Sequence, residues 1–453
     1  MKRLLPLALA LTACASVPKG AGYDRVARLV EERTGEKTIW ERGTPEDAEV
    51  SRRVDDLLAH DLTERSAVQI ALLDNPELQA TYEELGVAQA DLIQAGMLKN
   101  PTLDLSFRFP ETATAIFNTN VEVVMEFLSL FFLPMRKKLA EEQFEAAQLR
   151  LAHQVFQVTG EVRKQLYGLQ AAQQLVELRR KIVQAAAVSA ELAERQRKAG
   201  NIGELELESQ RGAHEQARLD LAREELALEM DRERLTRLLG LWGQRTGWKV
   251  TAALPDLPAQ EPALDKLESV AISRRLDVAR ARQEALLLEH ALEVAGAGRF
   301  LGSGIEVGVD RESGAEADVR VTGPTFHLEL PIFDQRQAEL RRLEAQQRQA
   351  RRRLEAISVD ARSEVRAARL GLLAQRQVVE HYRKVLLPIR ERTVAYAQQR
   401  YNAMLLGVFQ LLDARQAEIE GYRQYIEAVR DYWIARVELE RAAGGRLSEE
   451  EKK

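Results

Sequence analysis

The chain has 453 residues, of which 45% are hydrophobic and 30% charged, and its 26 glycines and 13 prolines are clustered so that long stretches contain neither. Such stretches favour long helices. The formal charge of −5 argues against nucleic acid as a partner. Beyond the N-terminus no segment has roughly 18 consecutive apolar residues, so a mature protein that crosses a membrane is expected to do so with strands.

The N-terminus is predicted to be an export signal. A basic start, Met1-Lys2-Arg3, precedes a short apolar run from Leu4 to Leu11, and residues 1–13 are expected to be removed. The segment Leu11-Thr12-Ala13-Cys14 is similar to the lipobox of bacterial lipoproteins, in which the cysteine is acylated. Cys14 is the only cysteine, so it has no internal disulfide partner and is predicted to carry the lipid. Ala15 follows it, and in lipoproteins the absence of aspartate there favours sorting to the outer membrane.

The rest of the chain consists of two tandem copies of one repeat. At an offset of 200 residues Ala71 matches Ala271, and at 203 Glu161-Val162-Arg163 matches Glu364-Val365-Arg366. Small insertions explain the drift of the offset to 204 near the end. The predicted organisation comprises a lipidated N-terminal segment at 14–61, a first repeat at 62–240, a linker at 241–263, a second repeat at 264–444 and a charged tail at 445–453.

Each repeat begins with a predicted helix, at about 62–99 and 264–297, which is followed by a β-hairpin at about 101–132 and 301–332. The strands alternate apolar and polar residues with period two, as in Leu103, Leu105 and Phe107 against Asp104 and Ser106. This pattern indicates strands with one apolar and one polar face, as in transmembrane β-barrels. The alternative is a half-buried hairpin on a soluble core.

A very long helix follows each hairpin, at about 135–199 and 334–403, and a return helix follows at about 204–240 and 408–443. Apolar residues recur every seven positions in both long helices, which predicts side-by-side coiled-coil packing. The positions are Val155, Val162, Leu169, Val176, Val183 and Ala190 in the first repeat and Val365, Leu372, Val379, Leu386 and Thr393 in the second.

Short turns at the far ends of the long helices form two predicted tips. Glycine and asparagine suit the left-handed conformation that closes a helix. The tip residues are Gly200, Asn201, Ile202 and Gly203 in the first repeat and Asn402, Ala403, Met404, Leu405, Leu406 and Gly407 in the second.

Four such strands cannot close a barrel, because the smallest bacterial barrels have eight and an open edge in lipid leaves backbone groups unpaired. The protein is therefore expected to oligomerise. Two protomers would give eight strands and three would give twelve, and an interior wide enough for solutes favours three.

The chain resembles the TolC-type outer membrane efflux factors over essentially its whole mature length. The matching motifs are Asn75-Pro76-Glu77-Leu78, Leu330-Pro331-Ile332-Phe333-Asp334, Arg400-Tyr401, and Leu411-Leu412-Asp413-Ala414. The resemblance implies a mainly α fold with a small β part: a homotrimer with a long antiparallel coiled-coil α-barrel and a twelve-stranded transmembrane β-barrel to which each protomer gives four strands. It implies a lipid-anchored protein of the bacterial outer membrane that extends into the periplasm.

The resemblance also implies partners, namely a periplasmic adaptor that meets the two tips and an inner membrane transporter. Family members commonly place a glycine shortly after the tyrosine that corresponds to Tyr401, where this chain has Asn402-Ala403-Met404. No cofactor is implied, and the six histidines show no spacing of a metal site. The predicted function is a passive duct of a tripartite efflux system, not an enzyme.

Two other classes remain as alternatives. A periplasmic adaptor or structural coiled-coil lipoprotein would share the signal, Cys14 and the heptads, but not two amphipathic hairpins. A periplasmic enzyme would need a clustered polar site, which the sequence does not suggest. The exported cargo stays open between metal cations, drugs and polypeptides.

Overall fold

The structure is a computed structural model that describes residues 20, 22–45, 47–108, 118–126, 128–261, 266–297, 305–313, 320–328 and 332–447. The chain forms two compact units. The first unit contains the described residues up to Arg25 together with those of 83–151 and 277–357, and the second contains those of 26–82, 152–276 and 358–453. Cys14 and the predicted signal lie outside the described residues.

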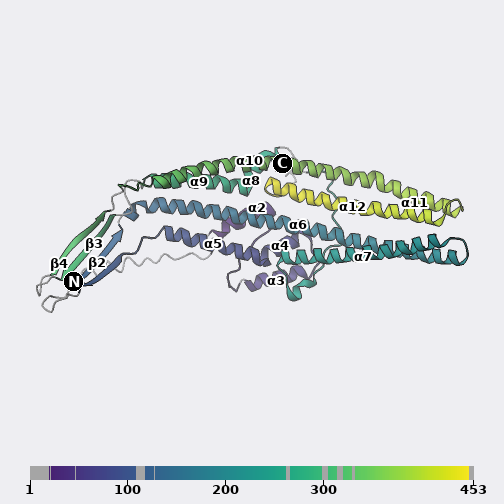
Figure 1. Ribbon diagram of the computed structural model, residues 1–453, viewed down its shortest axis with the longest axis horizontal. Helices are drawn as coiled ribbons and strands as arrows, with labels where there is room; N and C mark the ends of the chain where they lie inside the picture. The colour runs from purple at the N-terminus through teal and green to yellow at the C-terminus, as the bar shows by residue number, and fades with distance from the viewer. Residues whose placement is uncertain are drawn as a thin grey trace. The chain divides into compact units, whose positions relative to one another are not determined.

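The first unit contains one antiparallel sheet in the order β1-β2-β3-β4 (Figure 1). Its strands are β1 (Thr102–Arg108), β2 (Asn118–Glu126), β3 (Ile305–Ser313) and β4 (Arg320–Leu328). Each predicted hairpin is present, and the pairing of β2 with β3 joins strands that lie almost two hundred residues apart. The unit also holds most of α5 (Pro76–Ala95) and α9 (Leu276–Ala297), with the first parts of α6 (Leu128–Lys198) and α10 (Gln337–His381).

The second unit is helical in its described residues. Besides the remaining parts of α6 and α10 it contains α2 (Tyr23–Thr34), α3 (Asp47–Leu58), α4 (Glu64–Asp74), α7 (Glu204–Leu239), the 3-10 turn η1 (Gly243–Gly247), α8 (Leu267–Arg274), the π-turn η3 (Tyr382–Leu386), α11 (Leu387–Asn402) and α12 (Val408–Ala443). Figure 1 shows α6 with α7, and α11 with α12, as two helical hairpins. These hairpins confirm the long helices and return helices expected from the sequence.

Local chemistry sets several helix ends in the second unit. Thr63 caps α4 through a capping box: its Oγ1 accepts from the Ser66 backbone N–H at 3.2 Å, and its own N–H donates to Ser66 Oγ at 2.8 Å. Gly240 and Gly444 end α7 and α12 with φ of 77° and 83°. A Cβ on Gly240 would lie 2.4 Å from the Asp74 carbonyl oxygen, so glycine is required there for both conformation and space.

The first long helix differs from its expected bounds. It begins at Leu128 rather than near residue 135, so Pro134 lies inside it. Of its predicted heptad positions Val155, Val162, Leu169, Val176 and Ala190 are buried as expected, whereas Val183 is only partly buried.

The second long helix departs from the predicted heptad in its last two positions. Val365, Leu372 and Val379 are buried as expected, but the next buried positions are Leu387 and Val394 rather than Leu386 and Thr393. The π-turn Tyr382–Leu386 lies between them and takes up one extra residue. Pro388 follows directly and cannot donate a helical hydrogen bond. The seven-residue repeat therefore resumes one position later.

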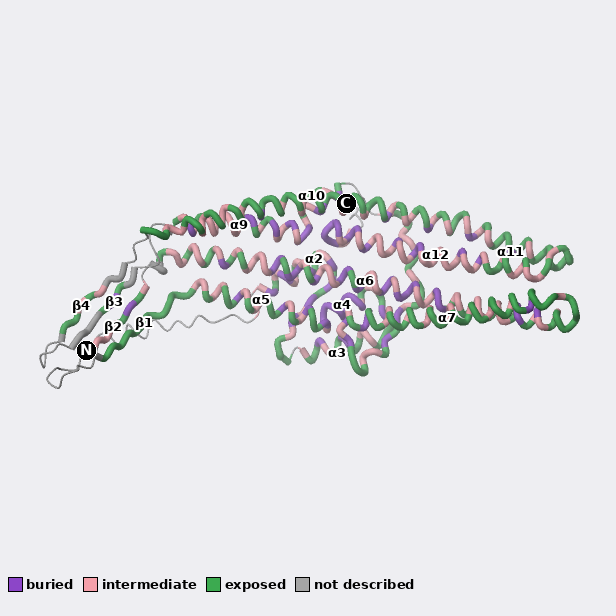
Figure 2. The backbone as a smooth tube through the Cα atoms, viewed as in Figure 1, coloured by how far each residue is buried: buried purple, intermediate pink, exposed green. Residues whose placement is uncertain are grey.

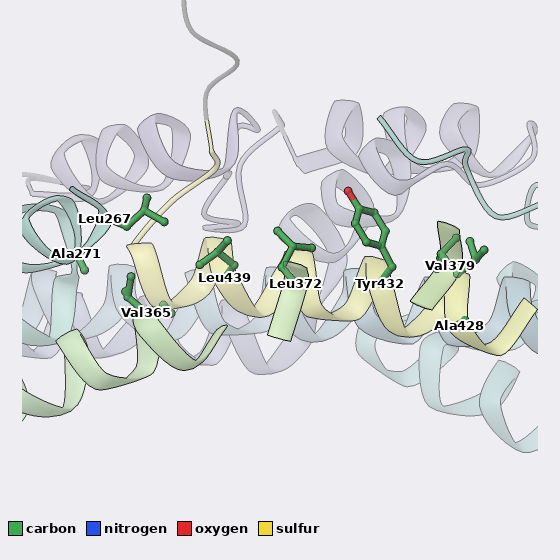
Figure 3. Packing of buried hydrophobic residues seen from close by; sticks show 10 residues of the cluster. Leu267, Ala271, Val365, Leu372, Val379, Ala428, Tyr432 and Leu439 are labelled. Carbon is green, nitrogen blue, oxygen red and sulfur yellow. The ribbon is translucent and has the colours of Figure 1, made fainter. Parts of the chain in front are cut away.

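The core of the second unit lies where α8, α10 and α12 meet. Leu267 and Ala271 pack with Val365, Leu372 and Val379, and Tyr432 and Leu439 complete the cluster from α12 (Figure 3). Figure 2 shows buried residues concentrated on α4 and the adjoining part of α6, whereas the ends of the hairpins are mostly exposed. Among the described residues, no helix combines the length and the apolar character needed to span a membrane.

Candidate functional site

One face of the sheet is apolar and exposed. The strand register aligns Leu103 with Val123 and Val123 with Val309 in one row across three strands. Leu103, Leu105 and Phe107 are each more than half exposed. Further exposed members of this face are Val123, Met125, Val307 and Val309. A contiguous apolar surface of this kind is typical of contact with lipid or with a partner.

The opposite face of the sheet is acidic. The register places Asp104, Glu122 and Asp310 in one row. Thr325 Oγ1 donates to Glu122 Oε1 at 2.7 Å and so holds this carboxylate on the sheet. Gly308 lies next to this hydrogen bond, and a Cβ at this position would lie 2.5 Å from Thr325 Oγ1. Glycine in this strand therefore makes room for the Glu122 contact.

The first tip has the expected turn chemistry. Gly200 has a φ of 76°, and the N–H of Asn201 donates to the Gln196 carbonyl at 2.9 Å across the end of α6. This is a Schellman closure with glycine in the left-handed position. Ile202 and Gly203 complete the turn, and Gly203 precedes the first residue of α7.

The second tip has the same geometry with a different residue. The N–H of Leu405 donates to the Arg400 carbonyl at 2.8 Å, which makes Met404 the counterpart of Gly200. Met404 has a φ of 59° and its side chain is 94% exposed. A side chain in this conformation costs roughly 1 kcal/mol. Asn402 ends α11, and Leu406 and Gly407 lead into α12.

A largely buried ionic cluster, in which Glu440 is buried and Arg163 and Glu64 are partly buried, joins α4, α6 and α12 in the second unit. Arg163 Nε lies 2.7 Å from Glu64 Oε1, and Arg163 Nη1 lies 2.5 Å from Glu440 Oε2. Tyr167 donates its hydroxyl to Glu64 Oε2 at 2.5 Å. Burial by itself would raise the pKa of Glu64, but the charge of Arg163 and the bond from Tyr167 hold it below its ordinary value.

The cluster was not predicted. Arg366 is the counterpart of Arg163 at an offset of 203, and it pairs with Glu268 at 3.0 Å, but at the offset of 200 that holds in this helix Glu268 is the counterpart of Val68 and not of Glu64. Among the described residues, no group of three or more His, Cys, Asp or Glu side chains could hold a metal ion. The arrangement holds helices together and suggests no bond-making chemistry.

The chain thus combines a four-stranded sheet that has an exposed apolar face with two helical hairpins. Comparison with known proteins gives the family. A sequence model of the family "Outer membrane efflux protein" matches residues 67–241 and 267–445. The chain belongs to this family, and its function is that of the outer membrane channel component of a tripartite efflux system. The two matched stretches agree with the internal repeat.

Individual relatives are distant but cover most of the chain. The cobalt-zinc-cadmium resistance protein CzcC of Cupriavidus metallidurans is 25% identical over 392 residues, which is 84% of this chain and 90% of that protein. The solved structure of CusC covers 85% of this chain and 92% of its own, with a TM-score of 0.69 and 18% identity. The Campylobacter jejuni CmeC outer membrane channel covers 89% of each chain, with a TM-score of 0.73 and 16% identity. These structures establish the shared fold.

Proposed function

We propose that this channel component works as a homotrimeric passive duct without catalytic activity. Within one chain, β1 and β4 each have a single neighbour in the sheet. Because unpaired strand edges are unstable in lipid, neighbouring protomers would supply the missing pairs and close a barrel of twelve strands. The observation that carries this proposal is the exposed apolar face of the sheet, which would face the lipid.

The lipid anchor at Cys14 is part of this proposal. It would fix the N-terminal segment in the outer membrane, with several acyl chains making attachment effectively permanent. Mass spectrometry of the N-terminal peptide tests it, because an acylated cysteine adds the mass of the chains. A mature chain that begins elsewhere, or carries Cys14 unmodified, would remove the anchor and leave the channel unaffected.

We further propose that the two tips contact a periplasmic adaptor, itself coupled to an inner membrane transporter. The exposed, conformationally strained Met404 supports this assignment, since strained residues persist where function requires the side chain. Met404→Gly is expected to weaken co-purification with the adaptor although it relaxes the backbone. Gly212→Ala, on the exposed side of α7 away from the tip, is the control and is expected to bind normally. Unchanged adaptor binding by Met404→Gly would remove Met404 from the contact.

The proposed cargo is cationic. The CzcC relative is named for resistance to cobalt, zinc and cadmium, and the carboxylates of Asp104 and Glu122, which are paired across β1 and β2, would line the interior of the closed barrel. Rings of carboxylates attract cations and repel anions.

Ion selectivity tests the lining directly. In a planar bilayer with a salt gradient, the channel is expected to pass potassium in preference to chloride, and Asp104→Asn combined with Glu122→Gln is expected to reduce that preference. Asp56→Asn, an exposed acid on α3, removes one charge elsewhere and should leave selectivity unchanged. A wild-type channel that carries chloride equally well would exclude a cation-selective lining.

A further inference from the structure

In the first unit, two long helices begin at the same end of the sheet. The strand β2 leads into α6, and β4 leads into α10. The register aligns Glu126 with Glu306 and Glu306 with His327 in one row at this end. The ends of β2 and β4 are therefore separated by two strand spacings, about 10 Å. Figure 1 shows both helices starting beside this end of the sheet.

Basic residues gather where the two helices begin. Residues 131–140 contain three basic and no acidic residues, and residues 332–342 contain three basic and two acidic residues. The two segments together have a formal charge of +4, in a chain whose formal charge is −5. We call the six basic residues the basic cluster, and they are Arg136, Lys137 and Lys138 on α6 with Arg336, Arg341 and Arg342 at the start of α10.

The basic cluster occurs in both copies of the internal repeat. At an offset of 200, which holds at the strand ends, Arg136 matches Arg336. At an offset of 203, which holds further along the long helices, Lys138 matches Arg341. Positive charge at this end of the sheet is thus a feature of the repeat and not of one segment alone.

The two basic segments lie on neighbouring elements. Lys138 Nζ on α6 lies 3.2 Å from His290 Nε2 on α9, and Arg351 on α10 contacts Glu289 of α9 at 3.4 Å. Because consecutive residues of α9 reach α6 and α10, α9 lies between these two helices. The six cations therefore belong to one surface of the first unit.

The cations of the cluster are available to an external anion. The Arg341 side chain is 83% exposed and contacts Glu344 at 3.0 Å, and the exposed Lys137 lies 4.0 Å from Glu141. Arg342 is also exposed. Exposed ion pairs of this kind contribute little to stability, so these side chains can exchange their partners for other anions at small cost.

Exposed apolar side chains lie next to the cluster in both segments. They are Phe131, Ile332 and Phe333, of which Phe333 is 92% exposed. A hydrogen bond from Gln337 Nε2 to the Phe333 carbonyl oxygen, at 3.1 Å, fixes the turn that carries this side chain. Apolar groups directly beside cations match a lipid leaflet, in which acyl chains meet charged headgroups.

From these observations we propose that the basic cluster binds the headgroups of anionic phospholipids at the membrane surface from which the helices emerge. Phe131, Ile332 and Phe333 insert among the acyl chains of the same lipids. The cluster follows directly on the exposed apolar face of the sheet, which is the order expected at a bilayer surface. This inference rests on the proposed lipid-facing sheet and adds the class of lipid that the protein selects.

Lipid retention tests the selectivity. The full-length protein in mild detergent would be incubated with equal amounts of phosphatidylglycerol and phosphatidylcholine and purified again, and its bound lipids would be counted by mass spectrometry. We expect at least about tenfold more phosphatidylglycerol than phosphatidylcholine, because each cation near an anionic surface strengthens binding by roughly fivefold. Raising the salt from about 0.05 M to about 0.5 M should remove most of this preference.

A triple variant tests the cluster itself. Lys137→Gln combined with Arg341→Gln and Arg342→Gln removes three exposed cations and alters no buried side chain. Its preference for phosphatidylglycerol is expected to fall to about twofold or less. The unfolding midpoint of the same sample shows whether the variant is folded.

The matched control removes the same charge from exposed positions of the second unit. Arg218→Gln, Arg223→Gln and Arg234→Gln on α7 each delete one arginine that pairs with an acid three residues before it. This variant should keep the wild-type preference. An equal loss of preference in the control would indicate general charge attraction and would overturn the proposal.

The remaining outcomes separate this inference from the lipid-facing sheet. Equal retention of the two lipids by the wild type, or an unchanged preference in the cluster variant, would overturn the cluster as a headgroup site and leave the lipid-facing sheet standing. Retention of neither lipid by the wild type would contradict both.

Discussion

The two repeats have the same order of elements but differ in three local features: the long helix, the residue at the tip and an ion pair. The first repeat has a continuous α6, a glycine at its tip and a partly buried ion pair between Glu64 and Arg163. The second has a π-turn, Met404 at its tip and an exposed ion pair between Glu268 and Arg366. Arg163 and Arg366 are equivalent positions at an offset of 203, yet they pair with acids from different positions of the repeat and in different surroundings.

The largest expected difference between the repeats is in the stability lost when each ion pair is broken. Arg163→Met would remove the 2.5 Å partner of Glu440, whose side chain is only 6% exposed, and leave it Arg436 at 3.7 Å, and we expect a cost of about 3 kcal/mol. Arg366→Met removes a partner from a pair that is 57% and 42% exposed, and is expected to cost less than about 1 kcal/mol. Denaturant unfolding followed by circular dichroism measures both. Similar losses for the two variants would contradict the proposed difference in burial.

Single-residue deletions test the role of the π-turn. Deleting Lys181 would turn the buried Ala190 and the partly buried Val183 away from the seam of α6 and is expected to cost about 3 kcal/mol. Its counterpart Lys384 lies inside the π-turn. Deleting Lys384, together with Pro388→Ala to permit an uninterrupted helix, restores seven-residue spacing from Val379 to Leu387 and is expected to cost less than about 1 kcal/mol.

The same unfolding measurement compares the two deletions at matched helix lengths. A Lys384 deletion that destabilises as much as the Lys181 deletion would show that the extra residue is structurally required. The π-turn would then have a structural role beyond shifting the heptad positions of the second long helix by one residue.

Acid is expected to weaken the first repeat through Glu64. Its folded-state pKa lies below the ordinary value of 4.5, so the carboxylate contributes stability above that pH, and this contribution is lost as the pH falls through the folded-state pKa. Between about pH 5 and pH 3 the wild type should therefore lose more stability than Glu64→Gln. Parallel pH profiles of unfolding for the two proteins check this, and identical slopes would exclude the effect.

The smallest expected difference concerns the tips. Met404→Gly should stabilise the second hairpin by about 1 kcal/mol, because glycine adopts the left-handed conformation without strain. Gly200→Ala should destabilise the first hairpin by a similar amount. Shifts of the unfolding midpoint in opposite directions would confirm that the two turns share one geometry, and shifts in the same direction would contradict it.

Periodic features of the fold could be predicted from the sequence, because period two and period seven directly reflect which side of a strand or helix is covered. The four strands, the helical hairpins and the buried positions from Val155 to Val176 follow from that rule. The shift to Leu387 and Val394 could not be predicted, since a π-turn leaves no period of its own. Only Pro388, which cannot continue the hydrogen-bond ladder, hinted at an irregularity.

The site was predictable to a lesser degree. The tip residues were located from glycine and asparagine, but Met404 was noted only as a departure from the family pattern, and its backbone conformation required coordinates. The Glu64, Arg163 and Glu440 cluster joins residues far apart in the chain, and charged residues on helices are usually solvated. The repeat gives no signal for this pairing, because the counterpart of Glu64 at the offset of 200 is Leu264 and Arg366 pairs with Glu268 instead.

The oligomeric mass of the mature protein is the most direct test of the proposed duct. The protein would be extracted from outer membranes in mild detergent and its mass measured with and without heating. We predict a heat-sensitive trimer with a residual β-sheet signal. A stable monomer that leaves the membrane when its lipid is removed would contradict the shared barrel.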